Sequence, residues 1–105
     1  MLIDFHTHIF PDRIAPGALQ QLLNNTRIYQ EIYGEAQPHT DATANGLSVS
    51  SKAAGLDISL VLPIATSPKP SPTINDFAAQ VDKLPGLRSF GSVHPRNPEF
   101  LQELE

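Results

Sequence analysis

Three polar residues near the start of the chain, Asp4, His6 and His8, are spaced as Asp-x-His-x-His. Carboxylates and imidazoles are common ligands of divalent metals. On a β-strand, side chains two positions apart point to the same face, and the two histidines stand about 6.6 Å apart along it. Their rings can then lean toward one cation. We therefore predict that His6 and His8 point to one centre and hold a metal, while Asp4 orients a histidine or acts as a further ligand.

The element that must position this motif is a β-strand, predicted over residues 1–7. Ile3, Phe5 and Ile9 share one parity and the polar motif takes the other, and Pro11 follows as a stop. The apolar residues indicate a strand in the core, where an aspartate and two histidines are costly to bury unless they are paired or bind a metal. The alternative is a polar strand face that meets water, with two solvated histidines.

Helices and strands alternate along the rest of the chain. Residues 58–62 are nearly all apolar, which is typical of a strand covered on both faces in a parallel sheet. The alternation predicts an α/β fold, with the second strand between the other two. Four helices are expected: over 16–23, from a Thr40-Asp41 cap through Ala54, over 74–83 with Thr73 as cap, and from Asn97 to Glu105. A third strand is expected over 87–93, and a proline-rich loop over 66–72. The stretch 27–37 is ambiguous and permits a short helix before Gly34.

The composition is that of one small domain of 105 residues. Seven basic and eleven acidic residues give a net charge of -4, which argues against a nucleic-acid partner. The absence of cysteine excludes disulfides, thiolate metal sites and a cysteine nucleophile. No apolar run approaches the roughly 20 residues of a membrane span, and no signal-peptide pattern is present. We therefore expect a cytoplasmic protein without a membrane partner.

The segment Met1–Asp12 resembles the opening of the amidohydrolase superfamily, in particular the branch of aminocarboxymuconate-semialdehyde decarboxylase-like proteins. The phrases Ala54–Asp57, Val61–Pro63 and Gly91–Pro95 resemble the same branch in the same order. The family fold is a (β/α)₈ TIM barrel of about 250 residues. The resemblance implies that residues 1–105 are an incomplete domain, made of the N-terminal three βα units of such a barrel.

The same resemblance implies a metal-dependent hydrolase, with water activated by a divalent metal, or a related non-oxidative decarboxylase. In this family His6 and His8 match the first-strand metal ligands, and Asp4 matches the acid of the same motif. The remaining ligands, and the acid that moves the proton, come from later strands, and no residue of this chain matches them. We assign no catalytic residue here, and whether the chain is itself an enzyme stays open.

The cofactor expected for such a site is a divalent metal ion. Zinc is the first choice for a histidine-rich, thiol-free site, and manganese is the alternative. Two further residues are candidates for the pocket of a small-molecule substrate. His94 ends the third predicted strand, and Arg13 follows the metal strand and could bind a carboxylate. Their alternatives are a structural histidine held extended by Pro95 and a surface ion pair with Asp12.

Two other functions remain open. One is a phosphoesterase of the polymerase-and-histidinol-phosphatase (PHP) type, which also opens with an Asp-x-His-x-His strand but needs more early histidines and an early acid. The other is a non-catalytic fragment or interaction module whose histidines are structural or bind metal incidentally.

Three barrel units leave two free sheet edges and uncovered apolar faces. We therefore expect association with the remainder of the barrel or self-association.

Overall fold

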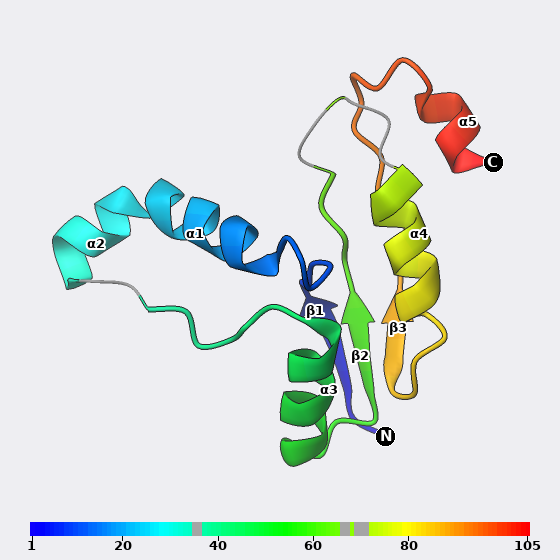
Figure 1. Cartoon of the computed structure of the whole chain (residues 1–105). Coiled ribbons are helices and arrows are strands. Elements are labelled where there is room, and N and C mark those ends of the chain that lie inside the picture. Colours follow the sequence, from blue (N-terminus) through cyan, green and yellow to red (C-terminus); the bar gives the residue numbers. More distant parts are fainter. Residues whose placement is uncertain (35–36, 66–67, 69–71) are drawn as a thin grey trace.

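The computed structural model describes residues 1–34, 37–65, 68 and 72–105. In this part of the chain, three parallel strands form one sheet in the order β1-β2-β3 (Figure 1). The α/β class and the central place of the second strand are thus confirmed. The strands are β1 (Ile3–Thr7), β2 (Ile58–Val61) and β3 (Leu87–Ser89), and the helices are α1 (Ala15–Asn25), α2 (Arg27–Tyr33), α3 (Ala44–Ala53), α4 (Pro72–Val81) and α5 (Phe100–Leu104).

The start of α3 differs from the prediction because of a local polar contact. The helix is capped by Thr43, whose side-chain oxygen accepts a hydrogen bond from the Gly46 amide at 3.0 Å. Asp41 in turn accepts hydrogen bonds from the amide and the hydroxyl of Thr43, each at 2.9 Å. The predicted cap at Thr40-Asp41 is therefore wrong by two to three residues, because those residues support the cap instead of forming it.

Two other elements are shorter than predicted. β3 ends at Ser89 and not at Val93, since Asn75 on α4 accepts the Ser92 amide at 2.8 Å and draws the chain away from the sheet. α5 begins at Phe100, because the Asn97 side chain accepts the Glu99 amide at 3.0 Å in a preceding turn.

Smaller differences complete the comparison of elements. α4 begins at Pro72, so that Thr73 lies inside the helix and does not cap it. β2 ends at Val61, one residue earlier than expected. A short helix before Gly34 is present as α2, and Gly34 is its C-cap. Most of the predicted loop over 66–72 lies outside the described residues.

One face of the sheet is covered by helices. Val61 and Leu87, each 1% exposed, form the core with Ile9 and Val81. The side chains packed against this core come from α3 (Ala44 and Leu47) and from α4 (Phe77). Both helices therefore cover the face to which Val61 and Leu87 point.

Among the described residues, no helix is found packed against the opposite face of the sheet. Side chains alternate along a strand, so Leu60 and Arg88 point away from the core, and Arg88 is exposed while Leu60 is partly exposed. The prediction that β2 is covered on both faces is thus wrong. Phe5, predicted to lie in the core, is 68% exposed, because only one face of the sheet has helices against it.

The helices α1 and α2 form an arm that extends away from the sheet (Figure 1). The base of this arm is fixed, since the Phe10 amide donates to the Ala42 carbonyl at 2.8 Å and Ala15 and Ala42 are buried. The arm lies in the connection between β1 and α3. It is therefore an insertion into the first βα unit.

The whole chain is more extended than a closed domain of its length. Its radius of gyration is 15.0 Å, against about 13 Å for a compact domain of this size. Its accessible surface is 7620 Å², against about 5800 Å² for a folded monomer of this mass. No helix in the described part of the chain has the length and apolar character needed to cross a bilayer.

Candidate metal centre

The imidazoles of His6 and His8 approach each other at the end of β1. Their Nε2 atoms lie 3.0 Å apart, and the rings meet edge to face with centroids 4.9 Å apart. Two nitrogens that are each about 2.1 Å from one cation, at an angle near 90°, lie about 3.0 Å from one another. This distance agrees with the prediction that both side chains point to one centre. Both side chains are exposed, so an ion from solvent can reach them.

A backbone carbonyl on the neighbouring strand orients the ring of His8. Nδ1 of His8 lies 2.7 Å from the carbonyl oxygen of Leu62, the residue that follows β2. A carbonyl only accepts, so Nδ1 must carry the proton. In the neutral ring, Nε2 then holds the free lone pair that a metal requires. Without a metal, the short distance to His6 fits a hydrogen bond from Nε2–H of His6 to Nε2 of His8.

The position of Asp4 differs from both predicted roles. Its Oδ1 accepts a hydrogen bond from the backbone amide of His6 at 3.0 Å, and no contact with an imidazole ring is found among the described residues. The pairing of β1 with β2 shifts between Asp4 and Thr7, which disturbs the simple alternation of side chains. The prediction that Asp4 shares the histidine face is therefore not supported. Asp4 instead holds the backbone that carries His6.

His94 lies in a tight turn between β3 and α5, five residues after the end of β3. Its carbonyl accepts the Asn97 amide at 2.9 Å, and its Nδ1 accepts the Arg96 amide at 3.1 Å. Because Nδ1 accepts, the proton of the neutral ring is on Nε2. His94 thus presents an N–H donor, whereas His8 presents a lone pair.

Arg13 lies in the turn that joins β1 to α1, and its side chain is exposed. The alternative prediction was a surface ion pair between Arg13 and Asp12. The part of the chain that the structure describes contains no such pair; an ion pair does join the N-terminal amine and Asp57, at 3.9 Å. The guanidinium is therefore open to solvent on the connection that leaves the histidine strand.

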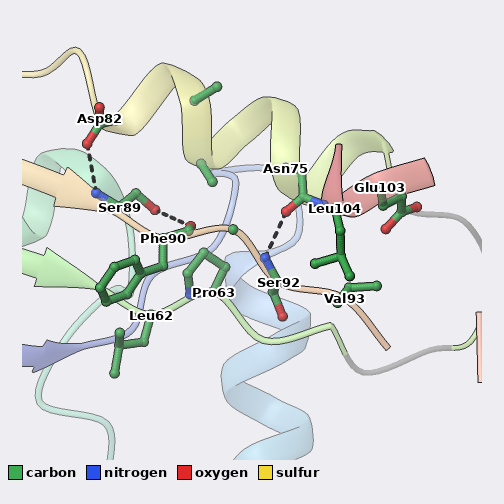
Figure 2. Close-up of a pocket in the computed structure, with 13 residues that line it drawn as sticks. Leu62, Pro63, Asn75, Asp82, Ser89, Phe90, Ser92, Val93, Glu103 and Leu104 are labelled. Carbon is green, nitrogen blue, oxygen red and sulfur yellow. Dashed lines mark hydrogen bonds between the residues drawn. The ribbon is translucent and has the colours of Figure 1, made fainter. Parts of the chain in front are cut away.

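A hollow lies elsewhere, between α4, α5 and the segment after β3 (Figure 2). Its volume is about 780 Å³. Asp82 accepts the Ser89 amide at 3.1 Å and Asn75 accepts the Ser92 amide, so the polar side chains along its wall already serve the backbone. Neither histidine of the pair lines this hollow, so it is separate from the candidate metal centre.

The histidine pair is not completed by a third ligand within the described ranges. No group of three or more histidine, aspartate or glutamate side chains that could hold a metal ion occurs there. The two contacts that sequence reasoning missed, Leu62 with His8 and Arg96 with His94, both use backbone atoms. Residue identity carries no signal for such contacts. Only the register of β1 against β2 could have indicated Leu62.

Comparisons with protein-family models, with curated proteins and with solved structures find no match for this chain.

Proposed function

We propose that residues 1–105 are the N-terminal part of an amidohydrolase-like (β/α)₈ barrel, in which His6 and His8 supply two ligands to a catalytic divalent metal, with zinc as the first choice. The observation that carries this proposal is the pair of Nε2 atoms 3.0 Å apart, with His8 oriented by the Leu62 carbonyl. A histidine ligand whose other nitrogen donates to a carbonyl is the usual arrangement around protein-bound metals.

The arrangement of the elements also supports the barrel. Consecutive parallel strands with α3 and α4 on one face, and an open opposite face, are what three successive barrel units produce. A doubly wound nucleotide-binding fold can begin in the same way. Its first strand, however, leads into a glycine-rich phosphate loop, whereas here β1 is followed by His8, Ile9, Phe10 and Pro11.

The proposed roles of the residues follow from the tautomers of the histidines and from the position of each residue in the fold. His6 and His8 hold the cation, and Asp4 fixes the backbone of the strand that carries them. A metal bound there supplies a Lewis acid that polarises a substrate oxygen or lowers the pKa of water. His94 offers an N–H donor in the segment that follows β3, and Arg13 offers a guanidinium. Both suit the oxygens of an anionic small molecule.

Titration of the chain with Co²⁺, followed by its visible absorption, tests the proposal. We expect weak, easily chelated binding of one ion, lost in His6→Ala and in His8→Ala. The matched control is His39→Ala, because His39 is exposed and lies outside the pair. Binding that survives in both single variants, or no binding at all, would leave a non-catalytic module as the better description.

An activity assay of the same chain tests the incomplete site. We expect no appreciable hydrolysis of an amide, an ester or a phosphate monoester, because two imidazoles leave the metal without the acid that moves a proton. Turnover of the phosphate ester that is abolished by His6→Ala would favour the PHP-type phosphoesterase. Turnover of the amide or ester, abolished in the same way, would mean that this chain builds a working site alone.

A further inference from the structure

β3 is an outer strand of the sheet, and one side of its backbone faces away from β2. Gly86 and Phe90 bond to β2, through the Gly86 carbonyl at 2.9 Å and the Phe90 amide at 3.1 Å. The backbone groups of successive residues in a strand point to opposite sides. Leu87 and Ser89 therefore direct their amides and carbonyls to the outer edge, where a further strand would pair.

Three of these outward groups already have partners in the same chain. The Leu87 amide donates to the Leu84 carbonyl at 3.2 Å, and the Leu87 carbonyl accepts from the Arg88 guanidinium at 2.5 Å. The Ser89 amide donates to Oδ1 of Asp82, the residue that follows α4, at 3.1 Å (Figure 2). An edge that is free by topology is thus closed by contacts within the chain.

A second contact from α4 keeps this edge short. The Ser92 amide donates to the Asn75 side chain at 2.8 Å, which draws the chain away from the line of the strand (Figure 2). Gly91 makes room for this contact, since a Cβ there would approach Oδ1 of Asn75 to 3.2 Å. β3 accordingly ends at Ser89. Short strands and charged side chains are the means by which proteins protect sheet edges from pairing.

We propose that Asp82 and Asn75 form an edge cap, which keeps another strand from pairing with β3 while α4 stays in place. A carbonyl of an incoming strand has to compete with the Asp82 carboxylate for the Ser89 amide. A carboxylate is the stronger acceptor, because its hydrogen bond is charge-assisted. Its negative charge also repels the carbonyl oxygens that an incoming strand would bring to this edge.

The edge cap is independent of the metal site. His6 and His8 lie on and just after β1, and β2 separates that strand from β3. In the proposed barrel, the next strand would pair with β3 and would have to take the Ser89 amide from Asp82. Outside a barrel, the same contact keeps a second copy of the chain away from this edge.

Amide hydrogen exchange followed by NMR tests the edge cap at one position. Asp82→Ala should speed exchange at the Ser89 amide by about 2- to 10-fold, the equivalent of one net hydrogen bond. Asp82→Asn should not, because it keeps an oxygen that accepts the amide. Asp76→Ala is the matched control, since Asp76 is exposed on α4 and its loss removes the same charge.

Sedimentation across a range of concentrations tests whether an opened edge accepts a strand. The probe is the chain itself, because a second β3 can pair with the first. Asp82→Ala combined with Asn75→Ala should have a higher weight-average mass than the parent at the same concentration. Its Ser89 amide should regain protection as the concentration rises, which places the contact at this edge. Asp82→Asn and Asp76→Ala should sediment like the parent.

Ser51→Ala separates an opened edge from a fold that is merely less stable. The Ser51 hydroxyl lies 2.7 Å from that of Ser59 on β2, so its loss weakens the fold and leaves the edge cap in place. This variant should sediment like the parent, and Co²⁺ binding should be the same in all of these variants. Unchanged exchange at Ser89, a double variant that sediments like the parent, or equal association of Ser51→Ala would overturn the proposal.

Discussion

The ring of His8 performs two tasks that two substitutions can separate. Its Nδ1 donates to the Leu62 carbonyl at 2.7 Å, and its Nε2 faces His6 at 3.0 Å. Asparagine places an amide N–H close to the Nδ1 position but has nothing at Nε2. His8→Asn should therefore keep the link to β2 and lose the metal ligand, whereas His8→Ala loses both.

The expected magnitudes follow from these contacts. Loss of a group that only orients a ligand costs about 10- to 100-fold in metal affinity, so loss of the ligand itself should cost at least about 100-fold, or about 2.8 kcal/mol. Both variants should show this loss equally. His8→Ala should in addition be less stable than His8→Asn by about 0.5–1.5 kcal/mol, the usual net value of one hydrogen bond.

Two measurements on the same samples check this prediction. Co²⁺ titration gives the affinity, and urea unfolding without metal gives the stability. The 3.0 Å separation corresponds to an angle of about 90° at the metal. The Co²⁺ complex should then have the weak visible absorption of a five- or six-coordinate ion. If His8→Asn binds Co²⁺ as the parent does, or if the two variants are equally stable, the assigned roles of Nε2 and Nδ1 are wrong.

Three further predictions concern stability. Ser51→Ala should destabilise the chain by about 1–3 kcal/mol in urea unfolding, because it leaves the fully buried Ser59 hydroxyl without its 2.7 Å partner, and the double alanine variant should cost less than the sum of the single ones. Leu87→Ala should cost about 2–5 kcal/mol by the same measurement, since Leu87 is fully buried in the core. Hydrogen bonds from the Thr43 amide and hydroxyl lower the pKa of Asp41. The contribution of Asp41 to folding stability is therefore present above the unfolded pKa near 4 and is lost as the pH falls through the lower folded pKa. Between about pH 5 and 2, the melting temperature should fall less in Asp41→Asn than in the parent.

Hydrophobic patterning predicted the elements of this fold, because the pattern is set locally. The period-two run of β1, the apolar run of β2 and the glycine after α2 all depend on residues close in sequence. The spacing of His6 and His8 is equally local, although His8 lies one residue beyond the end of β1 and its ring is held by the Leu62 carbonyl.

The parts that sequence reasoning missed depend on contacts between distant segments. Phe5 has the alternation of a core residue, yet it is exposed because the chain covers only one face of its sheet. Asp4 has the spacing of a third ligand, but a register shift in the pairing with β2 accompanies its turn to the His6 amide. Neither the cover of a face nor the register of a pairing can be deduced from the residue itself.

The geometry of a single strand explains why the histidine pair needs help from elsewhere. Two imidazoles at the end of β1 can reach a common ion, but a catalytic zinc site needs at least one further protein ligand. The neighbouring strand β2 contributes the Leu62 carbonyl, which is already used by Nδ1 of His8. Beyond it, His94 accepts at Nδ1 and so offers a proton at Nε2 in place of a lone pair. Neither residue therefore supplies a ligand, since the Leu62 carbonyl orients His8 and His94 presents a donor. In the proposed metal site, further ligands would have access from the side of the sheet that α3 and α4 do not cover.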